Sequence, residues 1–281
     1  MTAADLVASL AAPLLAAAFA SPQSQPAPPA ESILAKLEAA AGPAAARAAK
    51  KNLVMTGKLA VQGMPADASF EDLYAGADRV KLTVTMAGYG SATQGTTGEF
   101  SWSTDPAMGI MVRRGDEQGS VVRLYGAFRR APWSTLYERA EVAGRADRGG
   151  RSCWELRMVP KSGKTETWFV DAETSALAAV ATELPNPTGG TFPMDVEFSD
   201  YRPVDGILYP HVRVEKAGMY TLTYTATSIT HPDEIAADRV APPADVLAAA
   251  KDPKKAARRA PDKPGECALD TLAAQPVVTI R

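Results

Sequence analysis

The chain has 281 residues, of which 46% are apolar, and its 30 Lys and Arg side chains nearly balance 32 Asp and Glu side chains. This length allows one large β domain or two small ones, and the apolar fraction suffices for a substantial core. A formal net charge of −2 gives no electrostatic reason to expect a nucleic acid or an anionic membrane surface as a partner.

An apolar run at 6–20 opens the chain and is too short to span a bilayer comfortably. It ends in Ala-Phe-Ala at 18–20, a pattern typical of signal-peptide cleavage sites. The segment before it lacks Lys and Arg and contains Asp5. We interpret residues 1–20 as a signal peptide, which predicts an exported, periplasmic protein. The alternative is an Ala-rich helix packed on the domain. No later segment is apolar enough to cross a membrane.

A Pro-rich linker at 21–30 precedes strong helix formers at 31–51. Apolar side chains recur there at helical spacing. Gly42 and Pro43 should interrupt the helix, so we expect two short helices.

From residue 52 the pattern changes to strands. In the segment 79–86, Val80, Leu82, Val84 and Met86 alternate with polar side chains, which is the period of a half-buried strand. Further strands are expected at 52–62, 68–75, 89–98, 99–103 and 108–112.

The strand pattern stops at Gly115 and gives way to apolar residues at helical spacing. We predict a helix at 116–130 that lies on the sheet, ended by Pro132 and Trp133. Strands resume at 138 and continue to about 230. One more helix is expected at 244–251, at the start of a C-terminal tail at 244–281.

Three hairpins join the later strands. The tightest is predicted at Val-Asp-Gly, 204–206, because glycine tolerates the positive φ that a tight turn requires. Turn residues at 161–164 and 172–176 predict the other two. Together the elements predict an α+β fold: a long antiparallel sheet with helices on one face and solvent on the other. Such a curled sheet encloses a concave, apolar-lined space suited to small apolar ligands.

Large apolar side chains on these strands are the candidates for lining this space. The alternative for each is ordinary core packing. Methionine is favoured as a lining residue because its flexible thioether adapts to varied ligands. Trp133 is a candidate lid residue, with Gly115 and Gly126 as hinges. The candidate ligand-binding residues are Leu82, Val84, Met86, Trp102, Met108, Trp133, Trp154, Trp168, Tyr220 and Leu222.

The sequence offers little for catalysis. Its two histidines, His211 and His231, fit no metal-binding motif, and it contains no nucleophile elbow, dinucleotide-binding motif or P-loop. We therefore expect no catalytic residue, no metal and no cofactor. Cys153 and Cys267 allow one disulfide in an exported chain, and the alternative is two unpaired thiols.

Five motifs follow one another in order between residues 52 and 242. They are Phe70, Tyr74, Asp78 and Lys81; Gly98, Phe100 and Trp102; the segment 150–156; the segment 168–177; and the segment 199–210. In this combination the chain resembles the LolA/LolB-like superfamily of periplasmic lipoprotein carriers and their relatives labelled outer-membrane lipoprotein-sorting proteins.

The resemblance implies a curved, incomplete antiparallel β-barrel, or half-barrel, over residues 31–243, with helices covering its concave face. It also implies burial of lipoprotein acyl chains, lipid or another apolar ligand there. The carrier proper has an arginine near the position of Ala75 and Gly76, and none stands there in this chain. The implied function is therefore lipid or apolar-ligand binding in general.

We thus expect a non-enzymatic periplasmic carrier of an apolar ligand. The alternative is an interaction or sensor module that uses the half-barrel to dock an envelope protein, with an exposed strand edge pairing the partner. A third reading is a hydrolase with a site atypical of the family.

Overall fold

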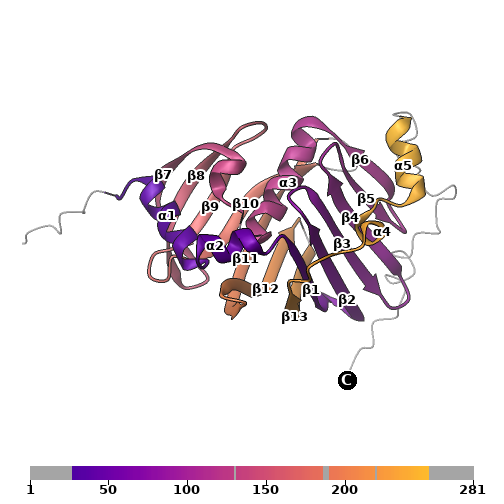
Figure 1. Ribbon diagram of the computed structural model, residues 1–281, viewed down its shortest axis with the longest axis horizontal. Helices are drawn as coiled ribbons and strands as arrows, with labels where there is room; N and C mark the ends of the chain where they lie inside the picture. The colour runs from indigo at the N-terminus through magenta and orange to yellow at the C-terminus, as the bar shows by residue number, and fades with distance from the viewer. Residues whose placement is uncertain (1–26, 130, 186–189, 219, 253–281) are drawn as a thin grey trace, which may run out of the picture.

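The computed structural model describes residues 27–129, 131–185, 190–218 and 220–252 (Figure 1). The predicted signal peptide, Cys267 and most of the tail lie outside these residues. The strands are β1 (Asn52–Val61), β2 (Met64–Ala75), β3 (Arg79–Met86), β4 (Gly90–Thr97), β5 (Ser101–Asp105), β6 (Gly109–Arg113), β7 (Tyr137–Arg148), β8 (Arg151–Pro160), β9 (Glu166–Asp171), β10 (Leu177–Pro185), β11 (Thr191–Val204), β12 (Ile207–Ala217) and β13 (Tyr220–Thr230). The helices are α1 (Ala30–Ala40), α2 (Ala44–Ala49), α3 (Gly115–Arg129), the 3₁₀ helix η1 (Trp133–Thr135), α4 (Ala237–Val240) and α5 (Ala244–Lys251).

All 13 strands form one antiparallel sheet in the order β6-β5-β4-β3-β2-β1-β13-β12-β11-β10-β9-β8-β7. Strand β1 pairs with both β2 and β13, so the first and last strands meet in the middle of the sheet. The two edges are β6 and β7, which do not pair with each other. The sheet is therefore an open, curved half-barrel with a few helices, and the predicted α+β fold class is confirmed.

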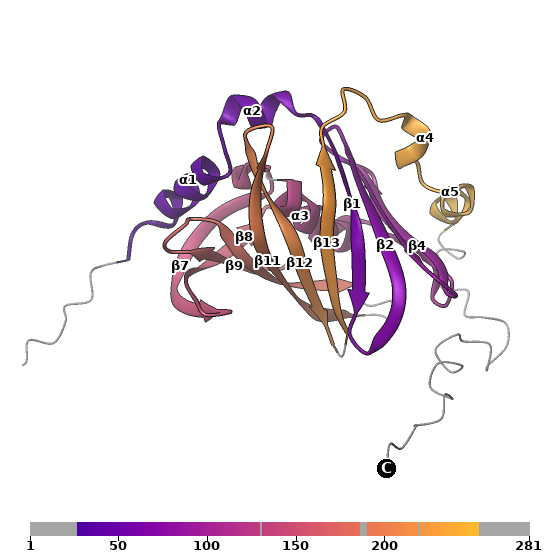
Figure 2. The ribbon, with the colours of Figure 1, turned by 90° about the horizontal axis from the view of Figure 1, so that it is seen from below.

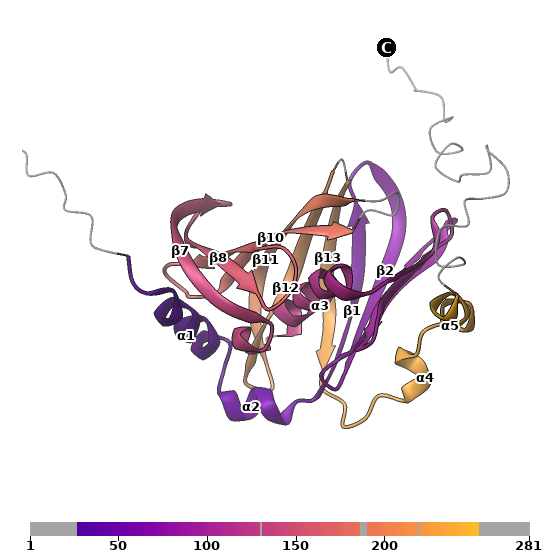
Figure 3. The ribbon, with the colours of Figure 1, turned by 90° about the horizontal axis from the view of Figure 1, so that it is seen from above.

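Helix α3 crosses the inside of the curved sheet because it joins its two edge strands (Figures 2 and 3). A link from β6 to β7 must traverse the sheet, and the concave side is where its apolar residues find partners. Leu124, Tyr125 and Ala127 are buried there in the main hydrophobic core. The predicted helix on the sheet is thus confirmed.

Two predicted breaks in the chain have a clear structural basis. Asp205 and Gly206 have φ values of +50° and +79°, which form the tight hairpin between β11 and β12. Gly42, between α1 and α2, has φ +116°, and a Cβ there would lie 2.5 Å from the carbonyl oxygen of Gly206. Only glycine therefore allows the helical segment to pass this close to the hairpin tip.

The convex face was expected to be solvated, and this part of the prediction was wrong for the β1–β6 half. Helix α4 packs on it through Val240, which joins Leu73 and Ile235 in a small cluster. Helix α5 covers β5 and β6, where Val246 contacts Trp102. Short helices after the last strand thus bury outward-facing apolar residues that would otherwise lie in water.

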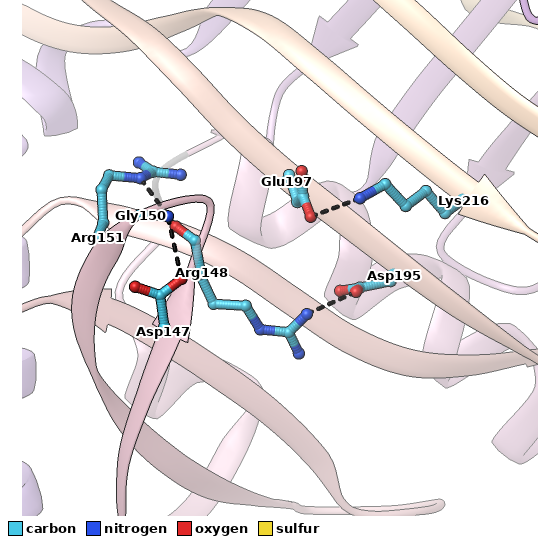
Figure 4. Close-up of polar contacts among 7 residues, drawn as sticks. All are labelled: Asp147, Arg148, Gly150, Arg151, Asp195, Glu197 and Lys216. Atoms are coloured by element: carbon cyan, nitrogen blue, oxygen red, sulfur yellow. Dashed lines mark hydrogen bonds and ion pairs between the residues drawn. The ribbon is translucent and has the colours of Figure 1, made fainter.

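The convex face of the other half carries ion pairs between strands (Figure 4) beside a small apolar cluster that includes Cys153 and Phe169. Arg148 of β7 donates to Asp195 Oδ2 of β11 at 2.7 Å, and its guanidinium lies 3.7 Å from the Phe169 ring centroid. Lys216 donates to Glu197 Oε1 at 2.7 Å beside it. Asp195 and Lys216 also line a wide, open hollow of about 460 Å³ together with Ala181 and Met194.

Candidate ligand-binding site

A cleft of about 690 Å³ lies on the concave side of the half-barrel. Helix α3 forms one wall, and β3, β4, the turn before η1 and the β8–β9 turn form the others. Its apolar lining includes Val80, Val122 and Leu136, and its polar lining includes Gln118 and Lys161. Apolar walls with a few polar groups are typical of sites for small amphipathic ligands.

Glycines in α3 shape this cleft. Gly119 and Gly126 line it together with Val122, because residues three, four and seven apart share one helical face. A Cβ at position 126 would lie 2.5 Å from Leu136 Cδ1, so glycine lets the η1 segment approach the helix. Sequence reasoning missed this wall. Two glycines seven residues apart in a predicted helix were the available signal, but Gly126 had been interpreted only as a hinge and Gly119 had not been considered.

A smaller hollow, of about 250 Å³, is a groove on the concave face of β3 to β6. Leu82 and Val84 of β3, Ala92 of β4 and the methionines Met108 and Met111 give it an apolar lining. The cleft and the groove use neighbouring inward positions of β3, since Val80 lines the first and Leu82 the second. Both hollows therefore belong to the same face of the same strands.

A cluster of buried charged side chains lies on the concave face in the middle of the sheet. Arg213 of β12 lies between Asp72 of β2, at 3.0 Å, and Glu215, at 2.9 Å. Its guanidinium carbon also lies 4.0 Å from the Tyr224 ring centroid. Burial raises the pKa of both Asp72 and Glu215, while the nearby Arg213 opposes this rise. The cluster fixes β2 to β12 across β1 and β13, because one cation serves two carboxyl groups.

A second buried pair holds α3 in place. Arg123 Nε donates to Glu166 Oε1 at 2.6 Å, and Arg123 Nη1 donates to the Ser162 carbonyl oxygen at 2.8 Å. Tyr137 donates to Glu166 Oε2 at 2.5 Å. Helix α3 is therefore tied to β9 and β7, so this wall of the cleft is fixed by charged hydrogen bonds as well as by packing.

Seven of the ten predicted ligand-binding residues lie on the concave face of the sheet. Leu82, Val84 and Met86 share the inward face of β3, and Leu82 and Val84 line the groove. Tyr220 and Leu222 lie near the start of β13, where Tyr220 is 46% exposed. The remaining two are Trp154, half-buried and stacked 4.2 Å from the Arg145 guanidinium carbon, and Trp168, which is buried.

The other three predicted residues, Met108, Trp133 and Trp102, lie away from the concave face of these strands. Met108 is 42% exposed in the β5–β6 turn, at the rim of the groove. Trp133 borders a small pocket with Trp168, and its backbone N–H donates to Glu38 Oε1 of α1 at 3.2 Å. None of the ten predicted residues lines the large cleft.

Trp102 lies on the convex face, fully buried beneath α5. It pairs with Gly95, whereas the inward positions of β4 are those of Gln94 and Thr96. The ring lies directly over Gly95, where a Cβ would come within 3.0 Å of it. The register of β5 therefore turns this tryptophan away from the concave site.

The described residues offer no group of three His, Cys, Asp or Glu side chains suited to a metal ion. The most catalytic-looking arrangement is a chain from Tyr209 through His231 to Asp205. Tyr209 Oη lies 3.0 Å from His231 Nε2, and His231 Nδ1 lies 2.9 Å from Asp205 Oδ2. It borders neither the cleft nor the groove, and it ties the end of β13 to the β11–β12 hairpin tip.

Cys153 is buried on the convex face beside Phe169 and Ala178. Its predicted partner lies outside the described residues, so the disulfide stays a prediction. Of the helices in the described part of the chain, none combines the length and the apolar character needed to cross a membrane.

No protein-family model and no curated protein matches this sequence. Solved structures do match. A LolA superfamily protein from Nitrosomonas europaea is 14% identical, with 76% of this chain and 97% of that chain covered and a TM-score of 0.49. A DUF1329 family protein from Desulfovibrio piger is 12% identical, with 76% and 100% covered and a TM-score of 0.47. A domain from Vibrio parahaemolyticus described as outer membrane lipoprotein-sorting is 13% identical, with 74% and 97% covered and a TM-score of 0.42. The chain is thus similar to structures of the LolA superfamily, the family that its sequence motifs resemble.

Proposed function

We propose that this protein is a non-enzymatic carrier that binds lipid, acyl chains or another apolar ligand inside the half-barrel. The observation that supports this most is the cleft of about 690 Å³ between α3 and the concave face. Its volume falls within the range of sites that enclose small molecules. Each methylene buried there would contribute about 0.8 kcal/mol to binding.

The lining favours an amphipathic ligand over a wholly apolar one. Val80, Val122 and Leu136 offer alkyl contacts, while Lys161 and Gln118 offer polar groups in the same hollow. A ligand with an alkyl chain and a polar end would satisfy both kinds of group at once.

Native mass spectrometry of protein purified from its own cell envelope tests the proposal. We expect a bound species of lipid mass in wild type and its loss in Val122→Trp, because the indole would fill the cleft. Glu117→Trp is the matched control, since it adds the same side chain to an exposed position of the same helix. Wild-type protein that is consistently free of ligand would contradict the proposal.

We also propose that the protein acts in the periplasm after removal of residues 1–20. The apolar run and the Ala-Phe-Ala pattern support this. N-terminal sequencing of the protein from its native host should then begin at Ser21. Mature protein that retains Met1 and stays in the cytoplasmic fraction would contradict it.

Docking of an envelope protein by strand addition is the competing function. Strand β7 is the longer edge strand, but its pairing with β8 has two register shifts and it carries exposed Glu138, Arg139 and Glu141. Bulges and charges are features that protect edges from pairing. The other edge strand, β6, has only five residues. These features favour ligand binding over strand addition.

A further inference from the structure

Strand β6 ends at Arg113, and Arg114, the next residue, faces the opposite side of the sheet. Arg114 is exposed on the convex side, where it donates to the Ala250 carbonyl oxygen at 2.9 Å and lies 5.2 Å from the Phe100 ring centroid. Arg113 pairs with Ser101 and lines the groove on the concave side with Met111. Substitutions of Arg114 can therefore serve as controls for substitutions of Arg113.

Arg113 is a half-buried cation whose Nε atom is buried. Within the described part of the chain, no Asp or Glu lies at ion-pair distance from its guanidinium, and its buried Nε has no hydrogen-bond acceptor. Its hydrogen bond to Ser103 Oγ is long, at 3.4 Å. Burial lowers the pKa of Arg113, which Tyr125 and Glu117 partly offset from a greater distance. A partly buried charge left this way destabilises the free protein.

The hydroxyl groups near Arg113 differ in their access to the groove. Ser101, which pairs with Arg113 across β5 and β6, is fully buried and does not line the groove. Ser103 lines the groove with Arg113, and its hydroxyl makes the long hydrogen bond. A guanidinium in this position is suited to a carboxylate or phosphate oxygen. Leu82 and Val84 extend the same groove with apolar surface.

We propose that Arg113 binds the anionic group of an amphiphile whose alkyl chain lies along the groove. This rests on the proposed carrier function and narrows its ligand to one class, a single alkyl chain ending in a carboxylate or a phosphate. The groove of about 250 Å³ fits one chain better than several. The anion would supply the negative charge that Arg113 lacks among the described residues.

Calorimetric titration of the full chain with dodecanoate, dodecyl phosphate and dodecanol tests this. We expect wild type to bind at least one anionic probe about tenfold or more tighter than the alcohol, as one charge-assisted contact allows. Arg113→Met should abolish that preference, so that the variant binds the two anions no more tightly than dodecanol. Arg113→Lys should keep most of it, and Arg114→Met, the matched control, should keep all of it. The tighter of the two anions identifies carboxylate or phosphate as the natural group.

The outcomes separate this inference from the function on which it rests. Equal binding of all three probes by wild type would overturn the anionic site and leave apolar-ligand binding intact. An unchanged preference in folded Arg113→Met would also overturn it. Failure of every probe to bind would overturn both. Thermal unfolding of each variant confirms folding, and Arg113→Lys supplies a folded comparison if the methionine variant unfolds.

Discussion

Two arginines on the concave face of the sheet, Arg213 and Arg113, lie in opposite environments. Arg213, at the centre of the sheet, lies between two carboxyl groups and against an aromatic ring. Arg113, on the β3–β6 wing, has no carboxylate at ion-pair distance within the described residues. In the centre, each buried charge is matched within the chain. On the wing, Arg113 has no carboxylate at this distance in the described part of the chain and borders an open groove, where the anionic group of a ligand would balance its charge.

The side chains are also packed more tightly in the centre of the sheet than on the β3–β6 wing. Helices α1 and α3 fill the centre and the β7–β10 side, where Leu34, Leu156 and Met158 are fully buried. On the wing, Val84, Met86 and Met111 are only half-buried. A filled region stabilises the fold, whereas a partly filled region of flexible methionines leaves room for a guest. The following experiments would break or sharpen this comparison.

The largest effect is expected from removing the central cation. Arg213→Met leaves Asp72 and Glu215 buried without a positive charge, so we expect a loss of about 3–5 kcal/mol in the free energy of unfolding. Urea titration measures it. Arg239→Met removes the exposed pair with Glu71 and should change stability by less than about 1 kcal/mol. Equal effects of the two substitutions would refute the central role of Arg213.

A smaller loss is expected at the anchor of α3. Glu166→Gln leaves Arg123 buried without its carboxylate, which should reduce stability by about 2 kcal/mol and speed amide hydrogen exchange in α3 selectively. Glu141→Gln, on an exposed pair with Arg139, is the control and should leave exchange in α3 unchanged. Uniformly faster exchange across the sheet would show that Glu166 does not act through the helix.

The central cluster should also respond to pH. Burial raises the pKa of Asp72 and Glu215, so the folded protein binds these protons more tightly than the unfolded chain does. Their contribution to stability is therefore present below about pH 4 and is lost as the pH rises through the raised values. Glu215→Gln removes one ionisation. It should match wild type near pH 4 and exceed it at pH 8, by about 1.4 kcal/mol per unit of raised pKa. A constant difference at both pH values would contradict this.

The smallest change in stability is expected on the β3–β6 wing, and it is a gain rather than a loss. Arg113→Met replaces an uncompensated, partly buried charge with an apolar side chain of similar length, so the ligand-free protein should gain about 1 kcal/mol. Differential scanning calorimetry should show a Tm about 2–4 °C higher. Arg114→Met should stay within about 0.5 kcal/mol of wild type. A clear loss of stability in Arg113→Met would show that the side chain serves packing rather than a ligand.

Local sequence signals located most of the elements of this fold. Alternation at 79–86 predicted β3, the Asp205-Gly206 turn predicted the β11–β12 hairpin, and Gly42 predicted the break between α1 and α2. These features depend on backbone preferences and on side-chain period, which neighbouring residues determine alone. The alternation also indicated that Leu82, Val84 and Met86 share a face.

The site depended on register and on contacts between distant segments. Alternation places Arg113 and Arg114 on opposite faces, and Trp102 opposite Ser101, but only pairing with β4 and β6 decides which of each pair faces inward. The cleft depends on α3 crossing the sheet, which follows from β6 and β7 lying at opposite edges. The sequence by itself therefore determined the strands, turns and helices, because these are local. The tertiary structure alone decided which side chains border the cleft and the groove, because strand order and register arise from contacts far apart in the chain.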